Sequence, residues 1–180
     1  MLQHAISEGI SILDGKLHSP AFIHFMQNRT NSNDPMLGLN DEIMALIKTR
    51  LNELKKYNIK YVIPIPSLTW AFRDKIAKKI GASLQAKTML DFLTWQNLPA
   101  HRQGELLNND QRKHNVNEKM TGDRNEKLVG DILLLDDYTG SGATLKEAAR
   151  VLRKEAGFKG KIIPFTIALI KWRLGKRGMI

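Results

Sequence analysis

The amino-acid sequence predicts a single α/β domain with a mostly parallel central sheet flanked by helices. Apolar runs typical of buried strands alternate with segments whose apolar residues recur at helical spacing. The length of 180 residues and the apolar content of 42% suit one compact core rather than two. No window approaches the roughly 20 consecutive apolar residues of a membrane span, and the first residues lack a signal-peptide pattern. We therefore expect a cytoplasmic protein.

The first half of the chain predicts a helix, a strand, a second helix and a second strand. Residues 40–57 form an amphipathic helix, because apolar residues recur on one face behind an Asn-Asp cap. The apolar residues on that face are Ile43, Leu46, Ile47, Leu51 and Leu54. The run KYVIPIPS then predicts a short buried strand that ends in proline-broken backbone. A basic helix follows near 71–80 and is closed by Gly81, and residues 82–93 are expected to supply another strand.

The last third predicts a strand at 131–135, a helix at 144–156 and a strand at 161–170. Parallel strands joined by such helices imply right-handed crossovers. Between these elements and the first half lies a polar segment of more than thirty residues, 94–128, with no clear element of its own. A structureless loop of that length is typical of a functional lid or of a linker. Residues 1–39 have no clear assignment.

The composition restricts the kinds of partner and metal site. The formal charge of +10, from 28 basic and 18 acidic residues, favours anionic partners from phosphorylated metabolites to nucleic acid. A basic tail at 171–177 is interpreted as a solvated terminus in preference to a nucleic-acid contact. The absence of cysteine excludes disulfides and thiolate metal sites, and the histidines lack HxxxH or HExxH spacing. A structural zinc site is therefore not expected.

The stretch ILLLDDYTGSGATLKEAARVLRK contains the strongest chemical signal. It runs from an apolar strand into Asp136 and Asp137, a glycine-punctuated turn and a helix. The motif GxxxxGK[ST] lacks its lysine here, and GxGxxG finds Leu145 in place of the third glycine. What remains is a turn at the N-terminus of a helix, where backbone N–H groups and the helix dipole favour a phosphate. Hydroxyl groups in the turn, those of Thr139, Ser141 and Thr144, add hydrogen bonds.

The two carboxylates define the other end of the expected ligand. They repel a phosphate but accept hydrogen bonds from a pair of vicinal hydroxyls. The ligand should therefore carry a phosphate beside a diol, as ribose 5-phosphate does. The alternative interpretation is a strand that ends in a capped turn, because Asp, Ser, Gly and Thr are ordinary turn residues.

This stretch resembles the phosphoribosyl-pyrophosphate (PRPP) signature of the type I phosphoribosyltransferases, which have a Rossmann-like fold. The resemblance implies that Asp136 and Asp137 hold the ribose hydroxyls. It implies that the 5-phosphate is held by Tyr138, Thr139, Gly140, Ser141, Gly142, Ala143 and Thr144. It also implies a pyrophosphate loop after the earlier strand, at 67–70, with Ser67, Leu68 and Thr69 in the PRPP site. In that loop we expect a non-proline cis peptide.

The stretch RQGELLNNDQRKHNV resembles a pattern of the phosphoribosyltransferases related to competence protein F (ComF). The matching residues are Gln103, Leu107, Arg112, Asn115 and Val116. With it the resemblance covers roughly residues 61–168. It implies that 94–128 is a lid whose cations Arg102, Arg112, Lys113 and His114 fold over a pyrophosphate; a solvated surface loop is the alternative. The chain departs from the family in lacking the cysteine-rich zinc module, and its RGFNQ stretch is reduced to AFRDKIA, in which Arg73 is comparable.

The resemblance implies transfer of the phosphoribosyl group of PRPP to a nitrogenous base, with release of pyrophosphate. Mg2+ is the expected cofactor, held by Asp136 and Asp137 directly or through water. The expected catalytic residues are Asp137, nearest the nucleophile, Asp136, Arg102 and Arg112. Residues 1–39 are the candidate hood over an unidentified base, with Phe22, His24 and Phe25 more typical of packing than of base stacking. A homodimer is expected from the resemblance.

Two other functions stay open at the level of sequence, because a fold does not fix an activity. A PRPP-sensing regulatory protein would bind PRPP without releasing pyrophosphate. A nucleic-acid-associated module in DNA uptake or repair would show salt-sensitive DNA binding that survives the loss of Asp136 and Asp137.

Overall fold

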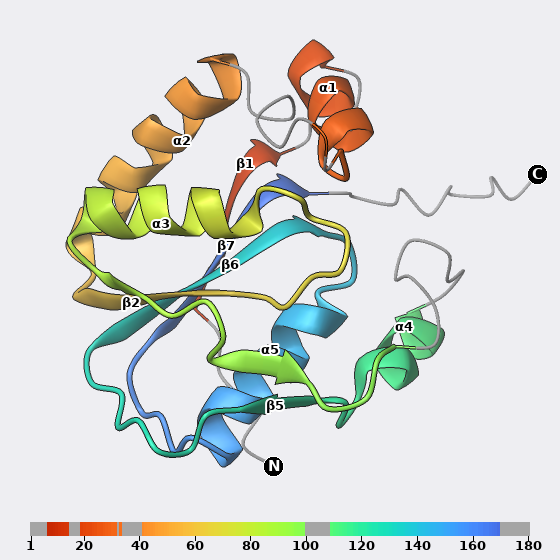
Figure 1. Cartoon of the computed structure of the whole chain (residues 1–180). Coiled ribbons are helices and arrows are strands. Elements are labelled where there is room, and N and C mark those ends of the chain that lie inside the picture. The colour runs from red at the N-terminus through yellow and green to blue at the C-terminus, as the bar shows by residue number, and fades with distance from the viewer. Residues whose placement is uncertain (1–6, 15–18, 32, 34–40, 100–108, 170–180) are drawn as a thin grey trace, which may run out of the picture.

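The computed structural model describes residues 7–14, 19–31, 33, 41–99 and 109–169. Its centre is a five-stranded sheet in the order β1-β7-β6-β2-β3, in which every neighbouring pair is parallel (Figure 1). The strands are β1 (Ile10–Asp14), β2 (Ile59–Pro64), β3 (Lys87–Thr88), β6 (Asp131–Thr139) and β7 (Ile162–Leu169). The predicted α/β class with a mostly parallel sheet is confirmed, and the arrangement is compatible with a Rossmann-like fold.

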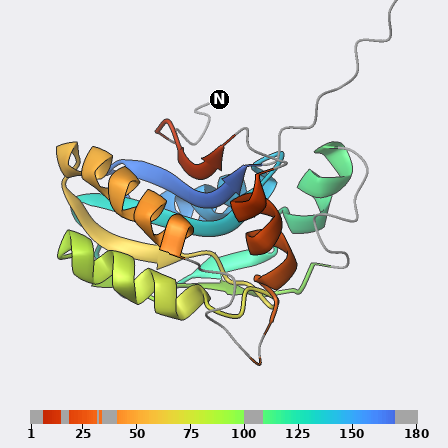
Figure 2. The ribbon, with the colours of Figure 1, turned by 90° about the horizontal axis from the view of Figure 1, so that it is seen from above.

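Helices cover both faces of this sheet (Figures 1 and 2). One face packs against α1 (Pro20–Asn28), α2 (Asp41–Glu53) and α3 (Arg73–Leu84). The other face packs against α5 (Ala143–Lys154) and the antiparallel pair β4 (Leu93–Trp95) and β5 (Met120–Gly122). Each face of the sheet therefore has its own hydrophobic core, and β6 contributes to both. Its side chains alternate, so that Leu133 and Leu135 enter the core on the first face and Ile132 and Leu134 the core on the second. A strand buried on both faces reads as a continuous apolar run, as ILLL does.

Helix boundaries differ from the sequence prediction, most clearly at the ends of α2 and α3. The helix expected at 40–57 is α2, followed by a short 3-10 helix, Leu54–Lys56. The expected stop at Gly81 is wrong, because α3 continues to Leu84 and ends at Gln85 in the left-handed conformation. Gly81 is needed for a different reason: a Cβ at this position would lie 2.1 Å from the hydroxyl oxygen of Thr88 on β3. The glycine therefore lets the helix approach the sheet closely.

The segment between the two halves has more structure than its composition indicates. Within 82–93 the sheet gains only the two-residue strand β3. Within 94–128 the structure describes the end of β4, helix α4 (Asn109–Val116) and β5, which pairs with β4. Buried apolar side chains anchor this part, among them Val116, Met120 and Leu128. These apolar residues are few and widely spaced among polar ones, so the sequence of this segment shows neither the helical nor the strand periodicity that would have predicted its elements.

The N-terminal residues join the same body. Strand β1 pairs with β7 at one edge of the sheet. Helix α1 begins at a Ser19 cap, whose side-chain oxygen accepts a hydrogen bond from the Phe22 amide, and Pro20 fixes the first turn. Phe22 and Phe25 are buried in the core, which is the packing role favoured from the sequence. No helix in the described ranges is long and apolar enough to cross a membrane.

The strand order places a switch point between β2 and β6. From β2 the chain moves through α3 to β3 on one side, and from β6 it moves through α5 to β7 on the other. Ligands of open parallel sheets bind at the carboxyl ends of the strands beside such a point. The carboxyl end of β2 leads into the 67–70 loop, and the carboxyl-terminal part of β6 contains the acidic pair, so both predicted sites lie at the switch point.

Candidate functional site

The acidic pair lies inside strand β6. The strand was expected to end at 135 but continues to Thr139, so both aspartates have extended backbone paired with β7. Asp136 is 7% exposed and Asp137 6% exposed. The Asp137 amide donates to Asp136 Oδ1 at 3.0 Å, and the Tyr138 amide donates to Asp137 Oδ1 at 2.8 Å. Each carboxylate keeps further acceptor positions for a ligand.

Burial makes this pair electrostatically costly. Loss of solvation raises the pKa of Asp136 well above its usual value, and the neighbouring Asp137 charge raises it further. Burial also raises the pKa of Asp137, although the Arg29 guanidinium and the Tyr138 amide oppose that shift. Two adjacent buried acids reduce stability and bring no compensating apolar packing. Such an arrangement at a strand end is typical of a functional site.

Arg29 is a site residue that the sequence analysis missed. It follows the last turn of α1, and its Nη1 atom donates to Asp137 Oδ2 at 2.5 Å. Its guanidinium carbon lies 4.7 Å from the centre of the Tyr138 ring. The Arg29 side chain is 16% exposed. No spacing rule connects residues 29 and 137, which only the packing of α1 against the sheet brings together.

The expected phosphate turn leads into α5 as predicted. Helix α5 begins at Ala143, and its N-cap is Gly142 with φ of 72°, a conformation that glycine adopts without strain. Ser141 Oγ accepts a weak hydrogen bond from the Ala143 amide at 3.4 Å. The first turn of α5 carries no acidic residue, so the positive end of its dipole is not neutralised there. Gly140 is exposed and the rest of the turn is half-buried, which leaves this helix end accessible to an anion.

The loop after β2 adjoins the acidic strand. The Ile65 amide donates to the Leu135 carbonyl at 2.8 Å, which ties the start of this loop to β6 just before Asp136. Ser67 Oγ accepts from the amides of Thr69, at 3.3 Å, and Trp70, at 3.0 Å. The Ser67 hydroxyl proton remains available for donation. The expected cis peptide is wrong, because the loop lies in the described part of the chain and no peptide bond there is cis; the Ser67 hydrogen bonds shape the turn with trans peptides.

Only part of the expected lid lies in the described residues. Arg112 lies in α4, while Arg102, Gln103 and Leu107 lie outside the described residues. Asn115 and Val116, which the ComF resemblance singled out, are buried at the end of α4. The burial of Val116 anchors this helix, and the closing of a cationic lid stays a prediction.

Arg73, another cation carried over from the resemblance, contacts the residue that follows β2 and its own neighbour in α3. Its Nη1 atom donates to the Ile65 carbonyl at 3.4 Å, and its Nε atom donates to Asp74 at 2.7 Å. The bond to Ile65 ties the start of α3 to the residue after β2, while the bond to Asp74 stays within α3.

The acidic pair offers two carboxylates to a metal ion. Within the described ranges, no group of three or more histidine and acidic residues could hold one. Two carboxylates fit Mg2+, which keeps several waters and is commonly held by one or two carboxylates together with ligand phosphates. The expected magnesium role of Asp136 and Asp137 thus requires the ligand to supply oxygens.

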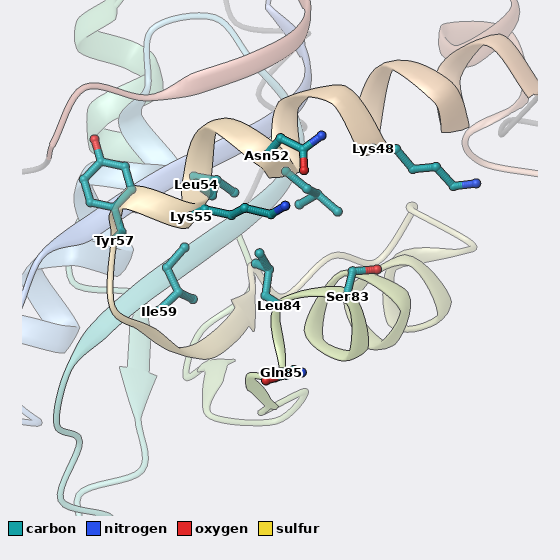
Figure 3. Close-up of a pocket in the computed structure, with 10 residues that line it drawn as sticks. Lys48, Asn52, Leu54, Lys55, Tyr57, Ile59, Ser83, Leu84 and Gln85 are labelled. Carbon is teal, nitrogen blue, oxygen red and sulfur yellow. The ribbon is translucent and has the colours of Figure 1, made fainter.

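A groove of about 550 Å³ lies elsewhere, between the end of α2 and the end of α3 (Figure 3). Lys48 and Lys55 stand along it, and Ile59 and Leu84 contribute apolar surface. Ile59 is the first residue of β2, so this groove is at the opposite end of the parallel sheet from the acidic pair. It contributes no residue to the candidate site.

The arrangement as a whole suits an anionic ligand that also carries hydroxyl groups. Carboxylates that accept hydrogen bonds, a helix N-terminus that donates them, and a polar loop converge at the switch point.

No family model matches the chain, and no curated protein matches its sequence. The functional conclusion therefore depends on the geometry of this site.

Proposed function

We propose that the protein is a type I phosphoribosyltransferase that binds PRPP with Mg2+ and transfers the phosphoribosyl group to a nitrogenous base. One observation carries the proposal. Two buried aspartates lie in the carboxyl-terminal part of a strand whose next residues form an open, glycine-capped helix N-terminus, at the switch point of a parallel sheet. A vicinal diol beside a phosphate fits that combination, and the ribose 5-phosphate part of PRPP provides both.

Each part of the site has a role in this reaction. The carboxylates of Asp136 and Asp137 accept hydrogen bonds from the ribose hydroxyls and fix the sugar ring. Residues 138–144 hold the 5-phosphate, partly through the first amides of α5, and the 67–70 loop receives the pyrophosphate. The bond from ribose C1 to the pyrophosphate oxygen breaks while a bond from C1 to a base nitrogen forms. Holding the two reactants in line contributes a large share of the rate.

Proton transfer falls to the acidic pair. The base loses a proton as its nitrogen bonds to C1, and Asp137, nearest the nucleophile, accepts it. A carboxylate whose pKa is raised by burial is a better proton acceptor than an exposed one. Mg2+, when bound with the ligand, screens the charge of the departing pyrophosphate. Arg102 and Arg112 add positive charge if the lid closes as the resemblance implies.

The test is calorimetric titration with PRPP and Mg2+ of the wild type and of the double variant Asp136→Asn/Asp137→Asn. We expect the variant to lose affinity by at least about a hundredfold, because it loses two hydrogen bonds to charged groups worth about 1.5–3 kcal/mol each. The matched control is Asp91→Asn, which removes one exposed carboxylate and should leave the affinity unchanged. Circular dichroism checks that each variant is folded.

The outcomes separate the candidate functions. Pyrophosphate release in the presence of a base identifies a transferase and its acceptor. PRPP binding without release under any base tested indicates a regulatory sensor. No PRPP binding by the wild type refutes both. DNA binding that falls with salt and survives the double substitution then favours the nucleic-acid module.

A further inference from the structure

We propose that Arg29 is a ligand-binding residue of this site and that it contacts the pyrophosphate group of PRPP. The inference rests on the proposed function and adds a residue to it. Neither the acidic motif nor the resemblance to phosphoribosyltransferases points to residue 29. The structure places it there through helix α1, which lies at the end of the sheet where β6 reaches its acidic pair (Figures 1 and 2).

Arg29 connects the two halves of the candidate site. Its side chain reaches Asp137 at the end of β6. Its carbonyl oxygen accepts a hydrogen bond from the Ala71 amide at 3.0 Å, immediately after the 67–70 loop. The residue is thus tied to the strand that would hold the ribose and to the loop that would receive the pyrophosphate.

The guanidinium is held in place but is not saturated with hydrogen bonds. The ion pair with Asp137 and the contact with the Tyr138 ring fix its position. Arginine has five N–H donors, and Arg29 Nε is buried without a partner in the described part of the chain. A buried donor without an acceptor is costly and rare. Because Nε has almost no accessible surface, a ligand oxygen beside the aspartates would instead be bound by the Nη donors, on a side chain that is 16% exposed.

Charge balance points to the pyrophosphate end of the ligand. Residues 66–72, PSLTWAF, supply no lysine or arginine, and Arg73 is already used by Asp74 and the Ile65 carbonyl. A pyrophosphate in the loop would therefore face Asp136 and Asp137 with no neutralising charge from the loop itself. Arg29, which is paired with Asp137, places a positive charge at this point. A planar guanidinium held at this position is suited to grip phosphate oxygens.

Three ligands distinguish this role from a structural one. Wild type, Arg29→Met and Arg29→Lys are titrated with PRPP and Mg2+, with ribose 5-phosphate, and with pyrophosphate and Mg2+. We expect Arg29→Met to weaken PRPP binding about 10- to 100-fold, as for the loss of a charge-assisted hydrogen bond. Pyrophosphate binding should fall with it, while ribose 5-phosphate binding changes less than about threefold. The control Arg50→Met removes an exposed arginine of α2 that pairs with Glu53.

Each contrary result has a definite meaning. Equal losses for PRPP and ribose 5-phosphate would make Arg29 a counter-ion of Asp137 alone, which overturns the inference. A gain in both affinities would show that Arg29 blocks the site, which also overturns it. PRPP binding by the wild type that does not depend on Arg29 refutes this inference and leaves the proposed function standing. A wild type that binds neither PRPP nor ribose 5-phosphate refutes both.

The lysine variant provides a second test in case Arg29→Met does not fold. Arg29→Lys keeps the charge beside Asp137 but loses the planar fork. If Arg29→Met does not fold, the same selective loss of PRPP and pyrophosphate affinity in Arg29→Lys, with ribose 5-phosphate unaffected, supports the assignment. Unchanged affinities in a folded Arg29→Lys would refute a role for the fork.

Discussion

Replacing Asp136 by asparagine should stabilise the folded protein at neutral pH while weakening ligand binding. Burial and the Asp137 charge raise the folded-state pKa of Asp136 well above the ordinary value of 3.8. A group with a raised folded pKa stabilises the fold fully at pH below its unfolded pKa, and this stabilisation is lost as pH rises through the folded pKa. At pH 8 the wild type therefore carries a penalty that Asp136→Asn lacks.

The size of the gain follows from the charges around the site. Two unit charges about 4 Å apart repel by about 4 kcal/mol at an effective dielectric constant of about 20. Arg29 offsets part of this repulsion through its ion pair with Asp137. The asparagine oxygen can still accept the hydrogen bond from the Asp137 amide. We therefore expect a gain of about 1–3 kcal/mol at pH 8, with the melting temperature rising about 2–4 °C per kcal/mol.

Urea unfolding of wild type and Asp136→Asn between pH 4 and pH 8 measures this gain. The difference in free energy of unfolding should grow with pH. Asp91→Asn, at an exposed position, controls for the substitution itself and should change stability by less than about 0.5 kcal/mol. If Asp136→Asn is less stable than wild type at pH 8, or gains equally at both pH values, the aspartates do not repel one another as described.

Two further substitutions test packing and ion pairing elsewhere in the fold. Arg150→Met should lower the free energy of unfolding by about 2–4 kcal/mol in urea unfolding, because it leaves the buried Glu147 carboxylate, now 2.8 Å from Arg150, unpaired; a loss below 0.5 kcal/mol would contradict this. Gly160→Ala should cost more than about 2 kcal/mol, since its Cβ would lie 1.8 Å from the Gly130 carbonyl oxygen. Gly157→Ala, with φ of 62° and open space around it, should cost only about 1–2 kcal/mol, and equal melting temperatures for the two variants would refute the steric argument.

The strand, the acidic pair and the turn into the helix were predictable because they are formed by consecutive residues. The ILLL run predicts a buried strand, and the following acids, glycines and helix predict their order in space. The structure corrected the details that depend on neighbouring elements. Pairing with β7 carries β6 through Asp136 and Asp137 to Thr139. Close packing against Thr88 keeps Gly81 inside α3, where its sequence position indicated an end.

The α/β class, the acidic pair and the turn before α5 could be predicted from the sequence, because burial periodicity and helix starts depend on residues near in the chain. Three features emerged only from tertiary packing: β1 completes the sheet, β4 pairs with β5, and Arg29 contacts Asp137. These are contacts between distant segments, and they are selected by how whole faces pack. Arg29 and Asp137 are separated by 108 positions, so no local pattern connects them.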